Sequence, residues 1–157
     1  MVDTDVWAEI ELLYRNRLGR FVRVARAITG DRELALEAVQ EGFADALRNA
    51  RQWDGRGPLE GWVWRCVVNR ARKTRRRPAA SPRAEADTGS ERPDDLALRA
   101  RLAALPERQR LCVFLRYFAD LEYHEIARVL EIEVGTVSAT LHAAHTALRN
   151  DLIEVVT

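Results

Sequence analysis

The sequence lacks most features that mark secreted, membrane-spanning and metal-dependent proteins. Its two cysteines, Cys66 and Cys112, lie in apolar helical stretches with no zinc-ligand spacing, so we expect buried, reduced thiols. No apolar run approaches the length that crosses a bilayer. The amino terminus carries acids where a signal peptide carries bases. We therefore expect a cytoplasmic protein.

Candidate catalytic groups are also scarce. Gly55, Gly57 and Gly61 follow no strand pattern, so they do not form a phosphate-binding glycine loop. His142 and His145 lie one helical turn apart, but no acid at ligand spacing completes a metal site with them. We expect no catalytic residue, no metal and no cofactor.

Helical spacing of apolar residues dominates the chain, and no strand alternation is persuasive. The pattern over residues 5–28 is typical of an amphipathic helix, with Gly30 closing it and Asp31 capping the next helix. Further helices are predicted at residues 31–50 and 59–77, from about 94 to 105, from Pro106, which suits a first helical turn, to Phe118, and at 122–130 and 134–150. The sequence therefore predicts an all-α fold.

One segment separates two predicted helical domains. Residues 78–95 contain three of the five prolines and almost no large apolar side chain, so nothing there favours burial. We expect a flexible linker at 78–95, between a helical domain at 1–77 and a second one at 96–157.

Positive charge concentrates in the first predicted domain. Residues 1–77 hold sixteen basic and eleven acidic side chains, although the whole chain carries a net charge of only +1. Trp53, Trp62 and Trp64 lead into a helix whose basic run, from Arg65 to Arg77, contains no acid. Cations neutralise phosphates and indole rings stack on unpaired bases, so this pattern favours binding to opened DNA. For any single tryptophan, packing in the core is the competing interpretation.

The last two predicted helices have the pattern of a helix-turn-helix. Ile126, Ala127 and Leu130 would face Val137 and Leu141 across a short turn. The small Ala127 allows a close crossing, and the second helix would lie in the major groove. A plain helical hairpin in an interaction domain is the alternative.

Six short motifs fall in an order that resembles a known family. They are V-Q-E at 39–41, the basic helix ending in R-R-R, L-P-E-R-Q-R at 105–110, L-R-Y-F at 115–118, E-I-A at 125–127 and G-T-V at 135–137. Together they resemble the extracytoplasmic-function (ECF) sigma factors of bacterial RNA polymerase, over residues 8–150. The resemblance implies sigma region 2 in the first domain, region 4 in the second, and no region 3.

The resemblance also implies roles for particular residues. Those expected to dock the polymerase clamp are Glu37, Gln40, Glu41, Phe43 and Asp45. Those expected to bind the non-template strand of the −10 element are Trp53, Trp62, Trp64, Arg65, Asn69, Arg70, Arg72, Lys73, Arg75, Arg76 and Arg77. Promoter DNA, core polymerase and an anti-sigma factor are the implied partners.

The reader helix of the helix-turn-helix departs from the family pattern. Family members usually carry lysine or arginine where this chain has Ser138, Thr140, Ala143 and His145. Glu131 also stands where a turn glycine is common, at a cost of roughly 1 kcal/mol if the backbone there is left-handed. The residues expected to contact −35 DNA are Arg108, Arg110, Arg116, Thr136, Ser138, Thr140, His142, His145 and Arg149.

This weak charge leaves two functions open. We expect the second domain either to bind −35 DNA weakly or to serve mainly in docking to protein. A sigma-like regulator that does not itself start transcription is the alternative for the whole chain.

Overall fold

A computed structural model describes the backbone of residues 2–76 and 93–156, all of it helices and connecting turns without a strand. The predicted linker lies almost wholly outside these residues, and so does Arg77. The first described helix of the second half begins at Pro93, inside the segment that the composition assigns to the linker. None of the described helices is both long enough and apolar enough to cross a membrane.

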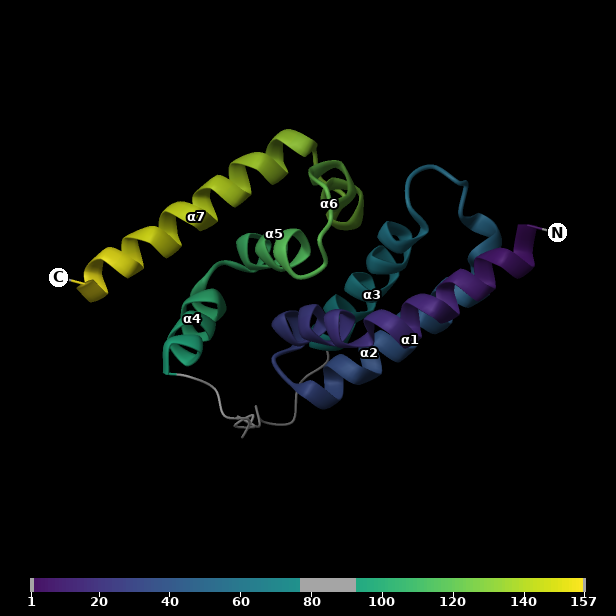
Figure 1. Ribbon diagram of the computed structural model, residues 1–157, viewed down its shortest axis with the longest axis horizontal. Coiled ribbons are helices and arrows are strands. Elements are labelled where there is room, and N and C mark those ends of the chain that lie inside the picture. Colours follow the sequence, from purple (N-terminus) through teal and green to yellow (C-terminus); the bar gives the residue numbers. More distant parts are fainter. Residues whose placement is uncertain (1, 77–92, 157) are drawn as a thin grey trace.

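The first half is a bundle of three long helices (Figure 1). They are α1 (Val2–Thr29), α2 (Arg32–Arg48) and α3 (Leu59–Arg76), with a short 3-10 helix, η1 (Ala50–Gln52), after α2. Each long helix packs on the other two. Their shared core contains Phe21, Phe43 and Trp64, which are almost completely buried.

Local sequence signals set the boundary between α1 and α2 as predicted. Gly30 adopts a left-handed backbone with φ of +77° and ends α1. The Asp31 carboxylate accepts a 2.8 Å hydrogen bond from the backbone N–H of Glu33 and caps α2. Helix α2 ends at Arg48, earlier than the periodicity indicates, and Leu47 in its last turn is 43% exposed.

Gly42 explains how closely α2 approaches α3. A β-carbon at this position would lie 2.7 Å from the Cα atom of Val67, a distance that real structures do not tolerate. The missing side chain therefore lets the two helix backbones meet. This crossing fixes the position of α3, the helix that carries the basic run.

The second half contains four helices. They are α4 (Pro93–Ala104), α5 (Glu107–Tyr117), α6 (Tyr123–Leu130) and α7 (Val134–Val156). Pro106 occupies the N-cap position of α5, and α7 extends beyond its predicted end. Ile126, Leu130, Val137 and Leu141 are buried, as the helix-turn-helix pattern predicts.

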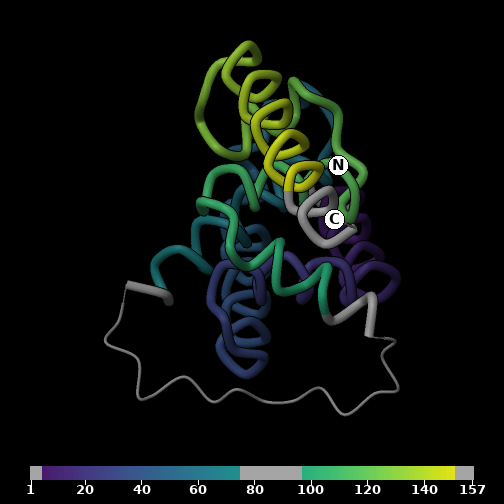
Figure 2. Tube along the Cα trace, turned by 90° about the vertical axis from the view of Figure 1, so that its left-hand side faces the viewer, coloured from purple at the N-terminus to yellow at the C-terminus, as the bar shows by residue number. Residues whose placement is uncertain are grey.

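The two halves also pack on each other, which the sequence did not predict. Helix α6 lies against α3, and α5 lies against α1. Helix α7 runs along the outer side of α5 and α6, away from α1 and α2 (Figures 1 and 2). The basic helix therefore sits at the junction of the two halves, whereas the predicted reader helix lies outside it.

Candidate nucleic-acid interface

The outer face of α3 carries the residues best placed to meet a nucleic acid. Arg65, Asn69 and Lys73 follow one another at four-residue spacing, so they share a face of the helix, and all three are exposed. Arg72 borders this face and is half-buried. The side chains of Arg75 and Arg76 lie outside the described residues. We call Arg65, Asn69, Arg72 and Lys73 the α3 outer face.

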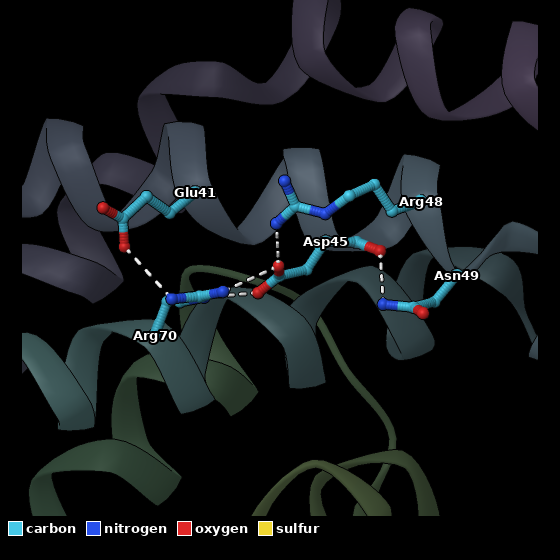
Figure 3. A network of polar contacts seen from close by, with 5 residues as sticks. All are labelled: Glu41, Asp45, Arg48, Asn49 and Arg70. Carbon is cyan, nitrogen blue, oxygen red and sulfur yellow. Dashed lines mark hydrogen bonds and ion pairs between the residues drawn. The ribbon is translucent and has the colours of Figure 1, made fainter.

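Arg70 does not belong to this surface, contrary to the prediction. Its guanidinium binds the Asp45 carboxylate of α2 through Nε and through Nη2, the latter at 2.8 Å, and lies 3.5 Å from Glu41 (Figure 3). Arg48 also donates to Asp45, at 2.5 Å. A two-point bond of this kind orients both partners and joins α2 to α3. Arg70 is therefore a structural residue in this conformation.

The same bonds change the chemistry of Asp45. The hydrogen bond from Arg70 holds the pKa of the Asp45 carboxyl below its ordinary value, although partial burial opposes the shift. Arg48 adds to the lowering. Asp45 is thus ionised over the physiological range, and its charge is directed at α3.

The residues predicted to dock on polymerase differ in how far the structure exposes them. Phe43 is only 4% exposed and makes edge-to-face contacts with Tyr14 and Phe21, at 5.2 and 4.9 Å between ring centroids. The Phe43 side chain is therefore not accessible to a partner in this conformation, and its burial supports a role in the core. Glu41 and Asp45 are half-buried and paired with Arg70, and Glu37 is half-buried. Gln40 is exposed on the outside of α2.

The three tryptophans also differ in burial. Trp64 is fully buried and stacks on Phe21, with ring centroids 3.8 Å apart, so it cannot stack on a base without unfolding the core. Trp53 and Trp62 are half-buried against the core and present part of their surface. The indole N–H of Trp53 is buried with no hydrogen-bond partner in the described protein. Trp53 and Trp62 remain the stacking candidates.

Contacts from the second half reach the α3 outer face at both ends. Arg65 forms an ion pair with Glu131, at the end of α6. Arg72 Nε lies 3.7 Å from Glu107, at the start of α5. Two cations of the predicted −10 surface therefore face carboxylates of the same chain.

Two further contacts join the halves beside this face. Arg128 of α6 donates a 2.8 Å hydrogen bond to the backbone carbonyl of Arg56, in the loop before α3. The Arg23 guanidinium of α1 lies 5.0 Å from the ring centre of Phe118, after α5. Sequence reasoning missed these residues, because nothing in their spacing pairs them.

Glu131 has the unusual backbone that the sequence indicated. Its φ and ψ are 57° and 47°, the left-handed region that glycine adopts more easily. It ends α6, whose start is closed by reciprocal hydrogen bonds between Glu122 and Glu125. The carboxylate that follows this strained backbone is the one that reaches Arg65.

Helix α7 presents an open but nearly uncharged surface. Ser138, His142 and Arg149 are exposed, and Thr136 and Thr140 are half-buried. The His145 ring is hydrogen-bonded at 2.9 Å to the Tyr117 hydroxyl. A shallow groove beside α7 is lined by Arg108, Gln109, Thr136, Ala139, Thr140 and Ala143, among others.

Two of the three arginines expected to supply phosphate contacts in this half have structural roles. Arg110 donates to the carbonyls of Ala103 and Leu105, at 3.0 and 3.1 Å, and so caps the end of α4. Arg116 donates to the Leu121 carbonyl at 3.2 Å. Arg108 alone of the three is exposed beside the groove.

The cysteines and histidines add no second site. Cys66 and Cys112 are free thiols, and burial raises the pKa of each to about 11, so both are protonated at neutral pH. Within the part of the chain that the structure describes, no group of three or more histidine, cysteine or acidic side chains is placed to hold a metal ion.

Comparison with known proteins gives matches to both halves. The family description "Sigma-70 region 2" matches residues 13–80, and "Sigma-70, region 4" matches residues 95–148. The RNA polymerase sigma-E factor of Streptomyces avermitilis is 31% identical over 155 residues, covering 92% of this chain and 85% of that protein. The ECF RNA polymerase sigma factor SigW of Bacillus subtilis is 25% identical over 173 residues, covering 96% and 90%.

Two solved structures share the fold. RpoE of Bartonella quintana, in complex with the anti-sigma factor NepR, gives a TM-score of 0.73 at 18% identity, covering 92% of this chain and 96% of that one. CnrH in complex with the cytosolic domain of CnrY gives 0.72 at 19% identity, covering 98% and 99%. Both likenesses extend over the two halves of the chain.

Proposed function

This chain belongs to the extracytoplasmic-function sigma factors of the sigma-70 family, and we propose that its two halves take unequal shares of promoter binding. As a sigma factor it binds RNA polymerase and directs promoter recognition and transcription initiation. The observation that carries this function is the ordered pair of region matches, 13–80 and 95–148, on two helical halves. The chemistry of RNA synthesis belongs to the polymerase.

The α3 outer face makes most of the contacts with promoter DNA. Arg65, Arg72 and Lys73 neutralise phosphates of the non-template strand at the −10 element, and Asn69 hydrogen-bonds a base edge. Trp53 and Trp62, in and after the preceding loop, stack on bases exposed by melting. This assignment is supported by the shared face of these residues and by the surface that both indoles retain.

Helix α7 makes fewer contacts with promoter DNA, and these are at the −35 element. Its threonine, serine and histidine side chains can hydrogen-bond to bases or phosphates, but Arg149 is the only arginine or lysine between Val134 and Asn150. Each missing phosphate contact means that one counterion fewer is released on binding, which lowers the affinity for DNA. We infer weak upstream binding, with Arg108 adding one phosphate contact from α5.

The exposed side of α2 docks on core polymerase. Gln40 is the exposed member of the expected set, and Glu37 and Glu41 border it. Acidic and amide groups there complement a basic polymerase surface. The protein acts in the cytoplasm, where core polymerase and DNA are, with domains at 1–77 and 96–157 joined by the linker 78–95. An anti-sigma factor is its proposed regulator.

Transcription in vitro tests the proposal. Core RNA polymerase is mixed with the purified full chain and a genomic DNA library, and transcript starts are mapped. We expect starts that need the chain and share a −10 motif, and Lys73→Ala should weaken them while the exposed control Arg32→Ala does not. A chain that adds no starts would instead be a sigma-like regulator, which contradicts the proposal.

A further inference from the structure

We propose that Arg70 couples polymerase docking to DNA binding: when polymerase engages the acids of α2, the Arg70 guanidinium leaves Asp45 and binds a phosphate of the strand on α3. This inference rests on the proposed function, because it assigns one further DNA contact to the same helix. Its structural basis is the ion-pair network in which Arg70 of α3 reaches across to Glu41 and Asp45 of α2 (Figure 3).

The charges of this network balance within the chain. Two carboxylates, those of Glu41 and Asp45, face two guanidinium groups, those of Arg48 and Arg70. A basic polymerase surface therefore meets little net negative charge at this part of α2. If the Arg70 side chain leaves, the network carries one net negative charge, and its attraction to a basic partner rises.

The acceptor sites of the Asp45 carboxylate are nearly filled. Its Oδ1 atom accepts from Arg48 at 2.5 Å and from Arg70 at 2.8 Å, and its Oδ2 atom accepts from Nε of Arg70. A carboxylate has about four lone-pair sites, so about one remains here. A polymerase cation that binds Asp45 at two points must therefore displace an arginine of the chain. Of the two arginines, only Arg70 belongs to the helix that is proposed to bind DNA.

Arg70 lies at the border between α2 and the α3 outer face. It precedes Lys73 by three residues, so the two side chains are neighbours on the surface of the helix. The side chains of Arg70 and Asp45 are 29% and 20% exposed, so a partner reaches their bond from solvent without opening the core. A change of side-chain rotamer can then turn the guanidinium toward Lys73, where the proposed phosphates lie.

Polymerase docking and DNA binding should therefore favour each other. In the free chain, the two-point bond to Asp45 holds the Arg70 guanidinium away from DNA. A polymerase cation on Asp45 removes that bond, and a phosphate beside Lys73 gives the released guanidinium a new partner. Each partner must then raise the affinity for the other by the same factor. A bond that only supports the fold would produce no such factor.

The first test frees Arg70 without polymerase. Asp45→Asn removes the carboxylate, and the affinity of the full chain for a −10-type single strand is measured by fluorescence anisotropy over a series of salt concentrations. We expect binding about two- to fivefold tighter than that of the wild type, with a salt slope steeper by about 0.7, because one phosphate contact is added. Glu33→Gln removes the same charge from an exposed position on α2 and should leave the slope unchanged.

Variants of Arg70 show whether it is the cation responsible. The gain should disappear when Asp45→Asn is combined with Arg70→Gln, whereas Arg70→Gln alone should leave the slope of the free chain unchanged. If Asp45→Asn loses its helical circular dichroism, Arg70→Lys replaces it, because lysine keeps the charge without the two-point bond and should give a steeper slope than Arg70→Gln. Equal slopes in Asp45→Asn and the double variant, or in Arg70→Lys and Arg70→Gln, would overturn the inference.

Core polymerase separates this inference from the proposed function. The affinity of each fluorescently labelled chain for core polymerase is measured with and without the single strand, and the strand should raise it about fivefold less for Arg70→Gln than for the wild type. If both chains start run-off transcription and respond equally to the strand, the coupling is refuted and the sigma function stands. If the wild type starts no transcription, the proposed function fails, and the slopes of the free chain alone decide whether Arg70 exchanges between Asp45 and DNA.

Discussion

Helices α3 and α7 are the two elements expected to meet promoter DNA, and they differ in the number of their cations and in how many of these are free of partners within the chain. Helix α3 is rich in cations, yet Arg70 is bound to α2 and Arg65 and Arg72 face carboxylates of the second half. Helix α7 is open along its outer side but carries one cation, Arg149, between residues 134 and 150. In this conformation the helix with many cations has several of them paired within the chain, whereas the helix with an open surface has almost no cations.

This difference between the helices predicts a low nonspecific affinity of the free chain for DNA. Nonspecific affinity for DNA comes almost entirely from the number of phosphates that a protein neutralises. A face on which Arg65 and Arg72 are directed at carboxylates of the same chain, together with a helix that has one cation, neutralises few.

The largest effect is expected from removing the support that holds α3. In Gly42→Ala the new methyl group meets the backbone of Val67, which cannot move without displacing α3 from α2. We expect a loss of about 1–3 kcal/mol in the free energy of unfolding, measured by urea denaturation.

Gly19→Ala is the matched control for this change. Gly19 lies inside α1, and a β-carbon there would meet nothing within 4 Å. Alanine should therefore raise stability by about 0.5–1 kcal/mol through helix propensity. Equal stabilities of the two variants would show that α2 and α3 are not in close backbone contact.

The next effect concerns the charge on α3. Lys73→Ala removes an exposed cation of the α3 outer face, so the slope of log affinity against log salt for single-stranded DNA should become shallower by about 0.7. Arg149→Ala on α7 should leave that slope unchanged. Fluorescence anisotropy over a series of salt concentrations measures both, and a larger change from Arg149 would reverse the ranking of the two helices.

Adding charge to α7 should produce a smaller gain. Ser138 is exposed on the reader helix, so Ser138→Arg supplies the kind of cation that this helix lacks. If the new guanidinium reaches a phosphate, the salt slope for duplex DNA should steepen by about 0.9. Ser138→Gln controls for side-chain length, and equal binding by both variants would mean that α7 does not approach DNA.

The smallest effect is the pH dependence of the bond between Asp45 and Arg70. Because the folded pKa of Asp45 is lowered, its stabilisation is complete above the unfolded value of about 3.9 and is lost as the pH falls through the folded pKa. Melting temperatures between about pH 5 and pH 2.5 should fall more steeply for the wild type than for Asp45→Asn. If the melting temperatures of the wild type and of Asp45→Asn fall equally with pH, the bond between Asp45 and Arg70 does not contribute to stability.

The helices and the helix-turn-helix were predictable because their signals are local. Apolar spacing, Gly30 and Asp31 act within a few residues, and the structure confirms the helices that they predict. The left-handed backbone at Glu131 was anticipated from its position in a turn. The helix predicted to begin at about residue 94 begins at Pro93, because proline and the following acids suit the first turn of a helix.

The roles of single side chains were less predictable, because they depend on partners far away in sequence. Arg70 resembles its basic neighbours in the sequence, and only the α2–α3 crossing brings Asp45 to it. Trp64 and Phe43 point into the core because of the helix phase, which composition does not reveal. The packing of α6 on α3 has no sequence signal beyond one unexpected acid, Glu131.

The distance between the two halves gives the decisive observation. Cysteines introduced by Arg32→Cys and Thr146→Cys, both at exposed positions, can carry a fluorophore pair, and the native thiols, with pKa values of about 11, should react slowly. Energy transfer in the free chain should report one narrow distance, because α6 packs on α3 and α5 packs on α1. A broad range of distances in the free chain would contradict the packing of the two halves that places the basic helix at their junction.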